Sequence, residues 1–357
     1  MNVLDYMERN GYEQLSVYTD ADVGLRAFIA IHDTTLGPAL GGVRMWPYAT
    51  EEEAVTDVLR LSRAMTYKSA AAGLHFGGGK GLIMADSHKD KTEALMRAFG
   101  RFVESMGGRY LTTEDVGMSL LDLEWIAQET RHVTGLPVSM GGSGETSMMT
   151  GWGVYRGMKA CAKEVWGTDS LSGKTIAFQG WGHTADFLAD HLLEKEEGVR
   201  FVVADIDEKA LDRARDRVGA RIVGTDELYD VECDIFSPCA LGAVLNGKTI
   251  PRLKCEIVCG SANNQLHDID DGDTLQSRGI LYAPDYIVNA GGVINISCEV
   301  GVPYSEDAAR EKTARIYETI QRVISLAKRE GVSTARAADR LAEERIAAVR
   351  KVRKVYL

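Results

Sequence analysis

The chain has 357 residues, a formal net charge of −11, 45% hydrophobic residues and 26% charged residues. These values are typical of a soluble globular enzyme with two domains, since a single hydrophobic core rarely grows beyond about 250–300 residues. The negative charge argues against a nucleic-acid partner, because phosphate backbones require a positive protein surface.

The N-terminal stretch predicts no secretory signal peptide. Residues 1–11 contain Asp5, Glu8 and Arg9 and no apolar run. No apolar stretch reaches the roughly 18 residues that a membrane-spanning helix needs. We therefore expect a cytoplasmic protein with no membrane partner.

Predicted helices and strands alternate in the first part of the chain. Residues 3–13 predict a short helix, and the apolar residues 27–32 predict a strand that glycines and a proline at 37–42 interrupt. Thr50 and Glu53 have the spacing of a capping box at the start of a long helix.

That long helix is expected to end just before Lys68. Residues 81–85 then predict a strand, residues 91–106 a helix, and residues 109–113 a strand that leads to Asp115. Because rigid scaffolds usually present chemistry at the ends of their elements, Lys68 and Asp115 are candidates for a site.

Three adjacent glycines precede Lys80. Bare backbone beside an ammonium group predicts a place where a small anionic ligand is held. A phosphate loop is excluded, because that motif needs glycine at position 74 and Ser or Thr after the lysine, where the chain has Leu74 and Gly81. A glycine turn with a solvated lysine is the alternative.

Lys68, Lys80 and Asp115 together suit a proton-coupled reaction on an amino acid. One lysine would hold the substrate carboxylate as a point charge, and the second would polarise a carbonyl or activate water. The aspartate would move protons.

Residues 135–147 are rich in Gly, Ser and Pro and predict a linker or hinge, which a helix follows. A strand at 174–179 then runs into a GxGxxA turn, Gly180 to Ala185, and a second strand at 199–204 ends in Asp205. At that distance a carboxylate accepts both ribose hydroxyls of NAD and repels a 2′-phosphate, so this unit predicts dinucleotide binding.

Two bulky residues stand inside the glycine turn. Trp181 would pack on the pyrophosphate side or point outward, and the sequence does not decide between these. His183 would contact phosphate or be an exposed histidine of the first helical turn.

Further strands at 233–236, 256–259 and 280–282 alternate with helical stretches, as a doubly wound parallel sheet requires. The turns at 237–240 and 260–263 follow two of these strands and are either part of the cofactor crevice or ordinary strand-to-helix turns. The C-terminal stretch predicts two helices, at about 307–328 and 335–351, separated by Gly331.

The six cysteines form no CxxC pair, and the seven histidines have no ligand-type spacing. We expect buried free thiols and no metal site.

Five motifs, in this order, resemble the amino acid dehydrogenases of the glutamate, leucine, phenylalanine and valine family. They are Met65–Lys68, Gly77–Lys80, Thr113–Gly117, Gly260–Asn264 and Asn289–Gly292. The similarity runs from about Ile31 to about Tyr356. It implies an α/β protein with an N-terminal α/β substrate and oligomerisation domain (residues 1–137 and 329–357) and a Rossmann-type, doubly wound NAD-binding domain (residues 138–328), with the catalytic cleft between them.

The resemblance also assigns roles to residues. Lys80 and Asp115 match the catalytic pair, Lys68 the substrate-carboxylate lysine, Asn263 an asparagine near substrate and nicotinamide, and Thr150 a contact of the nicotinamide amide. The other expected cofactor-binding residues are Gly180, Gly182, His183, Thr184, Asp205, Cys239, Ala240 and Asn289. The expected side-chain pocket and its edge are Leu40, Gly41, Thr113, Thr134, Val293 and Ile296.

In the implied mechanism, hydride passes from the amino acid Cα to NAD, and water activated by Lys80 attacks the resulting imine. The carbinolamine collapses to the 2-oxo acid and ammonia while Asp115 shuttles protons. For this, the pKa of Lys80 must be lowered, which desolvation and the neighbouring Lys68 charge would both do.

The expected pocket has no charged side chain, which disfavours glutamate and favours leucine, isoleucine and valine. Residues 113–115 and 293–295 are similar to the leucine enzymes of the family. The loop at 142–150 is more similar to the phenylalanine enzymes, so an aromatic substrate is the alternative.

The sequence also argues against two further alternatives. A catalytically silent NAD-binding regulator would have lost at least one of Lys68, Lys80 and Asp115, and all three are present. An engineered amine dehydrogenase would have replaced Lys68 and Asn263, and both are intact. The resemblance also implies a homo-oligomer, an octamer or a dimer.

Overall fold

The computed structural model describes residues 2–240 and 242–353, with the side chain of Arg353 left aside. The chain forms two compact units. Unit 1 consists of Met1–Glu145, Ile296–Ser305 and Ala342–Leu357. Unit 2 consists of Thr146–Asn295 and Glu306–Leu341.

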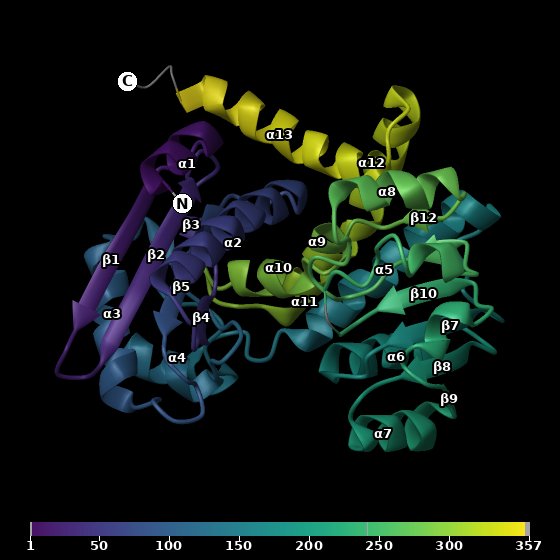
Figure 1. Ribbon diagram of the computed structural model, residues 1–357, viewed down its shortest axis with the longest axis horizontal. Coiled ribbons are helices and arrows are strands. Elements are labelled where there is room, and N and C mark those ends of the chain that lie inside the picture. Colours follow the sequence, from purple (N-terminus) through teal and green to yellow (C-terminus); the bar gives the residue numbers. More distant parts are fainter. Residues whose placement is uncertain (1, 241, 354–357) are drawn as a thin grey trace. The chain divides into compact units, whose positions relative to one another are not determined.

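Unit 1 is built on a mixed six-stranded sheet (Figure 1). The strand order is β1-β2-β5-β3-β6, and β4 also pairs with β5. The strands are β1 Gln14–Asp20, β2 Leu25–Asp33, β3 Ala39–Leu40, β4 Val43–Trp46, β5 Gly77–Met84 and β6 Tyr110–Leu111. β1 and β5 run antiparallel to β2, whereas β3 and β4 run parallel to β5.

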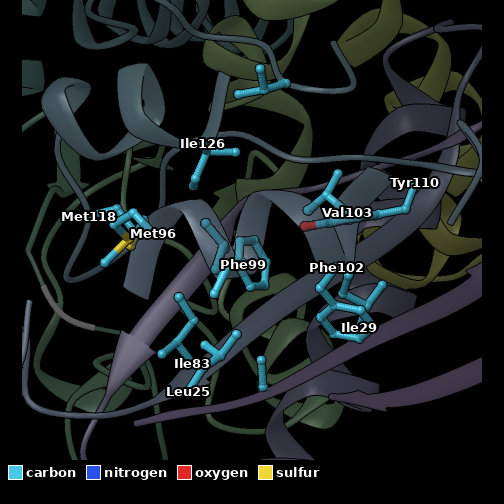
Figure 2. Close-up of a cluster of buried hydrophobic side chains, with 14 of the residues drawn as sticks. Leu25, Ile29, Ile83, Met96, Phe99, Phe102, Val103, Tyr110, Met118 and Ile126 are labelled. Atoms are coloured by element: carbon cyan, nitrogen blue, oxygen red, sulfur yellow. The ribbon is translucent and has the colours of Figure 1, made fainter. Parts of the chain in front are cut away.

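Helices cover both faces of this sheet. They are α1 Val3–Asn10, α2 Glu51–Ala71, α3 Glu93–Ser105, α4 Leu120–Ala127 and the last part of α13 Thr334–Arg353. Side chains alternate between faces along a strand, so Ile29 and Ile83 pack with Phe99 of α3 in one core (Figure 2). On the opposite face, Leu82 packs with Leu59 of α2.

The glycines before Lys80 belong to β5 and not to a turn, and all three are buried. A Cβ on Gly78 would lie 2.1 Å from the backbone nitrogen of Thr66, and one on Gly79 would lie 2.7 Å from the ring of Tyr110. The expectation of a bare surface open to a ligand is therefore wrong. The missing side chains allow α2 and β6 to approach the strand that carries Lys80.

Unit 2 contains a six-stranded sheet in which every pairing is parallel. Its strands are β7 Thr175–Gln179, β8 Arg200–Ala204, β9 Arg221–Ile222, β10 Ile235–Pro238, β11 Ile257–Val258 and β12 Leu281–Tyr282. The spatial order β9-β8-β7-β10-β11-β12 is the 3-2-1-4-5-6 order of doubly wound dinucleotide-binding sheets. The predicted fold class is confirmed.

The helices that follow or flank these strands complete unit 2. They are α5 Ser147–Trp166, α6 His183–Lys195, α7 Glu208–Val218, α8 Ile269–Ser277, α9 Asp285–Val288, α10 Gly291–Ser297, α11 Glu306–Ala314 and α12 Ile316–Glu330, with α10 continuing into unit 1 and α13 beginning in unit 2. Three short 3₁₀ helices lie at Val138–Met140, Glu227–Asp230 and Ile250–Arg252.

Several boundaries differ from the sequence predictions. Lys68 lies in the last turn of α2 and not beyond it. The single helix expected at 307–328 is two helices separated at Arg315. Strand β3 forms inside the glycine-rich stretch that was expected to be a break.

Among the described residues, no helix has both the length and the apolar character that crossing a bilayer requires. The same part of the chain contains no group of three or more His, Cys, Asp or Glu that would hold a metal ion. All six cysteines are free thiols, and four of them are buried.

Candidate functional site

Unit 1 contains a buried ion pair between Lys80 and Asp115. Lys80 Nζ lies 2.8 Å from Asp115 Oδ2, and the lysine is only 5% exposed. Alternation along β5 places the Lys80 side chain on the same face as Gly78 and Leu82, which is the face that α2 covers. Asp115 is brought there by the segment that follows β6.

Arg44 joins this pair to a second carboxylate. Its Nε donates to Asp115 Oδ2 at 2.9 Å, and its guanidinium also donates to Asp57 Oδ2 at 3.0 Å. Tyr48 and Arg60 donate to Asp57 as well. The sequence prediction missed Arg44 and Asp57, because a single arginine on a short strand and a single aspartate in a helix match no motif.

The electrostatics of this cluster suit proton transfer. Burial lowers the pKa of Lys80, the ion pair with Asp115 opposes this, and the positive charge of Arg44 lowers the pKa further. Arg44, which the sequence prediction missed, is thus a positive charge that lowers the pKa of Lys80. Burial alone would raise the pKa of Asp115, but Lys80 and Arg44 hold it at about 2. Asp115 is ionised at neutral pH.

The expected substrate-pocket residues divide between the two units. Leu40, Gly41, Thr113, Thr134 and Ile296 belong to unit 1 with Lys68, whereas Val293 and Asn263 belong to unit 2. Within unit 1, a Cβ on Gly135 would lie 2.7 Å from Thr113 Oγ1 and 3.6 Å from Ile296 Cγ2, so these two side chains flank one glycine.

Unit 2 has the glycine turn at the carboxyl end of β7. Gly180 has φ 96°, and a Cβ there would lie 2.4 Å from Cβ of Ala240, which follows β10. β7 and β10 are the neighbours between which the strand order reverses, and ligands of doubly wound sheets bind beyond this point. A Cβ on Gly182 would meet nothing within 4 Å.

Helix α6 begins at His183, and its N-cap residue, Gly182, has no side chain that could cap it. The first backbone N–H groups of a helix lack intrahelical partners and favour an anion such as a phosphate. The exposed His183 and half-buried Thr184 lie in this first turn.

Asp205 is fixed beside the turn. Its carboxylate accepts the backbone N–H of Trp181 at 2.6 Å and that of Asp207 at 2.9 Å. Trp181 adopts neither of the two orientations considered for it, because the side chain is fully buried. Its ring packs edge-on against Phe178, and its indole nitrogen donates to Asp186 Oδ1 at 2.8 Å.

Other expected cofactor residues lie near the carboxyl ends of the strands. The Cys239 N–H donates to the carbonyl of Gln179, and Asn289 Nδ2 donates to Asn263 Oδ1 at 2.8 Å. A Cβ on Gly292 would lie 3.1 Å from Thr150 Oγ1. Within the described residues, the buried oxygens Gln179 Oε1 and Asn289 Oδ1 accept no hydrogen bond. These two unpaired oxygens could accept hydrogen bonds from a bound dinucleotide. The N-terminus of α6 and the open space at Gly182 could accommodate its phosphates.

Two family models match the chain. The dimerisation domain of Glu/Leu/Phe/Val dehydrogenases matches residues 13–132, and the Glutamate/Leucine/Phenylalanine/Valine dehydrogenase model matches residues 204–354. The chain belongs to this family. The predicted resemblance is confirmed, and the chain is an amino acid dehydrogenase of the family.

Individual relatives are similar over almost their whole length. A leucine dehydrogenase from Thermoactinomyces intermedius is 54% identical, with 100% of this chain and 97% of the relative covered. A phenylalanine dehydrogenase from Caldalkalibacillus thermarum is 44% identical, with 97% and 94% covered. The crystal structure of L-tryptophan dehydrogenase from Nostoc punctiforme is 41% identical, with a TM-score of 0.85 and 98% and 99% covered.

Proposed function

We propose that the protein catalyses the NAD-dependent, reversible oxidative deamination of leucine, valine and isoleucine to the 2-oxo acid and ammonia. The buried Lys80–Asp115 pair carries this proposal, because it combines a lysine of lowered pKa with an ionised carboxylate at 2.8 Å. The 54% identity to a leucine dehydrogenase, against 44% to a phenylalanine dehydrogenase, supports an aliphatic substrate.

The mechanism follows from these side chains. When bound, the nicotinamide ring accepts the hydride that leaves the substrate Cα. Lys68 holds the substrate carboxylate as a point charge. Neutral Lys80 takes a proton from water as the water oxygen attacks the imine carbon, and Asp115 stabilises the ammonium that forms. The Lys80 ammonium would then protonate the carbinolamine nitrogen while Asp115 accepts the hydroxyl proton, so that the C–N bond breaks and ammonia and the 2-oxo acid are released.

Asp205 supports NAD rather than NADP as the cofactor. Its carboxylate is held in place by two backbone N–H groups and would repel a 2′-phosphate. We expect Asp205→Asn to weaken NAD binding and to improve the ratio of NADP to NAD use by about tenfold, since one repulsive charge is worth on the order of 1 kcal/mol. Steady-state rates with the two cofactors measure this ratio. An unchanged ratio would contradict the assignment.

We further propose the domain division given by the resemblance, with residues 1–137 and 329–357 as the substrate and oligomerisation domain and residues 138–328 as the NAD-binding domain. We also propose that the protein is a cytoplasmic homo-oligomer. The match of a dimerisation-domain model to residues 13–132 supports the homo-oligomer. Light scattering on the purified protein tests for an octamer or a dimer.

The decisive experiment compares NADH formation at alkaline pH with leucine, valine, phenylalanine and glutamate, with Lys80→Ala as the control. Leucine and valine leading, and an inactive Lys80→Ala, are the expected results. A lead for phenylalanine would favour the aromatic alternative that the loop at 142–150 suggests. NAD binding without turnover on any substrate would favour a silent regulator.

A further inference from the structure

Four charged side chains form a continuous row in unit 1. Its order is Asp57, Arg44, Asp115 and Lys80, and the successive distances are 3.0, 2.9 and 2.8 Å. Arg44 and Lys80 both contact the same oxygen, Asp115 Oδ2. The other oxygen, Oδ1, therefore carries neither of these ion pairs.

The elements that carry the row are fixed relative to one another. The residues on either side of Arg44 are hydrogen-bonded to the segment of Asp115, because Val43 N–H donates to the Thr113 carbonyl and Met45 N–H to the Val116 carbonyl. Asp57 comes from α2 and accepts hydrogen bonds from Tyr48, Arg44 and Arg60. The row thus joins β4, α2, β5 and the segment after β6.

We propose that Arg44 and Asp57 are positioning residues for the reaction: Arg44 holds the Asp115 carboxylate beside Lys80, and Asp57 holds Arg44. This inference rests on the proposed function, since it takes Lys80 and Asp115 as the catalytic pair. Arg44 suits the task because a guanidinium contacts two carboxylates through separate nitrogens, whereas an ammonium is a single point charge.

Asp57 also compensates the positive charge of Arg44. Arg44 places a second positive charge next to a buried lysine, and like charges without compensation would disfavour both ionised side chains. The carboxylate of Asp57 balances Arg44 from the opposite side. Lys80 is the most buried member of the row, since its side chain is 6% exposed and those of Asp115, Arg44 and Asp57 are 25%, 22% and 16% exposed.

A cavity of about 770 Å³ opens at the outer end, and Arg44, Tyr48, Asp57 and Arg60 line it. Asp57 therefore lies at the open end of the row, whereas Lys80 lies at the buried end.

The charges that face Lys80 come from three neighbouring elements. Asp115 follows β6, Arg44 lies on β4 and Asp57 on α2, which also carries Lys68. The un-ionised phenol of Tyr110 lies on β6 and donates to the carbonyl of Gly41. Arg44 lowers the pKa of Lys80 and Asp57 raises it, after the larger effects of burial and of Asp115. Removal of the Arg44 charge should therefore raise the pKa of Lys80, and removal of the Asp57 charge should lower it.

The test is the pH dependence of kcat/KM for leucine with the full-length enzyme. Arg44→Met should move the ascending limb to higher pH by about one pH unit, and Asp57→Asn should move it to lower pH by a similar amount. Arg60→Met is the matched control, because Arg60 contacts the other oxygen of Asp57 at 2.8 Å and has no ion pair with Asp115. The ascending limb of the Arg60→Met profile should lie at the same pH as that of the wild type.

Arg44→Lys separates charge from position. It should leave the limb near the wild-type pH but lower kcat, since one ammonium cannot reach both carboxylates. Thermal unfolding and NAD binding verify that each variant is folded, and Asp57→Asn alone suffices if Arg44→Met does not fold.

The inference would be overturned if the ascending limbs of Arg44→Met and Asp57→Asn moved in the same direction, or did not move. Lys80→Ala would still be inactive in that case. Wild-type activity in both Lys80→Ala and Asp115→Asn would instead overturn the catalytic pair, and no turnover of leucine or valine by the wild-type enzyme would overturn the proposed function. The two failures are therefore distinguishable.

Discussion

Asp115 shows how strongly one carboxylate depends on its surroundings. Its side chain is largely buried, yet two cations hold its pKa at about 2. Because this pKa lies below the value of about 3.9 in an unfolded chain, the folded state gains stability from the carboxylate above pH 4. That gain is lost as the pH falls from about 4 to about 2.

Asp115→Asn tests this linkage. We expect the wild type to exceed the variant in free energy of unfolding by about 2 kcal/mol at pH 6, and the difference to shrink as the pH falls below 4. Urea unfolding of both proteins at a series of pH values measures it. A difference that stays constant down to pH 3 would show that the carboxylate is not held by the two cations.

Trp181 is the second residue whose role the structure decides. We expect Trp181→Phe to lower the free energy of unfolding by about 1–3 kcal/mol, because Asp186, itself 9% exposed, loses a hydrogen bond. NAD affinity should change little, since the indole points into the core. Calorimetry of unfolding and of NAD binding separates the two effects, and a large loss of affinity alone would contradict this account.

At the scale of elements, the two glycines of the turn after β7 have different tasks. Gly180→Ala should destabilise the protein by about 1–3 kcal/mol, because φ is 96° and the added Cβ would lie 2.4 Å from Ala240. Gly182→Ala should leave the melting temperature nearly unchanged but weaken NAD binding, since the new methyl group would occupy open space at the uncapped start of α6.

Melting curves with and without NAD measure this contrast. Equal loss of stability in both variants would indicate that Gly182 is also a packing residue.

The junction between α2 and α13 has an electrostatic basis. Arg345 donates to the carbonyls of Ser69, Ala70 and Leu74, which include groups at the C-terminus of α2. Arg345→Met should cost about 1–3 kcal/mol, because these acceptors lose their donor while the apolar stem is retained. Thermal unfolding is the measurement. Glu344→Gln, one position away and exposed, is the control with no expected effect.

Elements with a clear period were predictable from the sequence. The alternation and apolar runs of β2, β7 and β8 and the amphipathic spacing of α2 identified them within a few residues. β3 has only two residues, which is too short to show a period, whereas the strand predicted at 109–113 is present as the shorter β6. The glycines of β5 gave a turn signal because the atoms that exclude their side chains come from α2 and β6, which are distant in the sequence.

Some residues of the candidate site could also be predicted from the sequence, and others could not. Lys68, Lys80, Asp115 and the glycine turn could be proposed because each belongs to a motif. Arg44 could not, because only the folded chain shows that it bridges Asp115 and Asp57. The inward orientation of Trp181 likewise follows from the packing of Phe178 and the position of Asp186.

At the scale of the whole molecule, the two units differ in how continuous their segments are along the sequence. The six strands of the parallel sheet lie within residues 175–282, in one uninterrupted run. Unit 1, in contrast, is assembled from three separate segments. One of its hydrophobic clusters joins Leu36 and Ala70 to Ala342 and Ile346.

This cluster has a consequence for the order of events on the ribosome. Leu36 can form its contacts in this cluster only after Ala342 has been synthesised. At 5–20 residues per second, roughly 15–60 s separate the synthesis of the two residues. The parallel sheet is fully synthesised before α13 emerges, so nascent unit 1 leaves the apolar surface around Leu36 and Ala70 exposed until α13 has been synthesised. During this interval the surface around Leu36 and Ala70 is open to aggregation and to capture by chaperones.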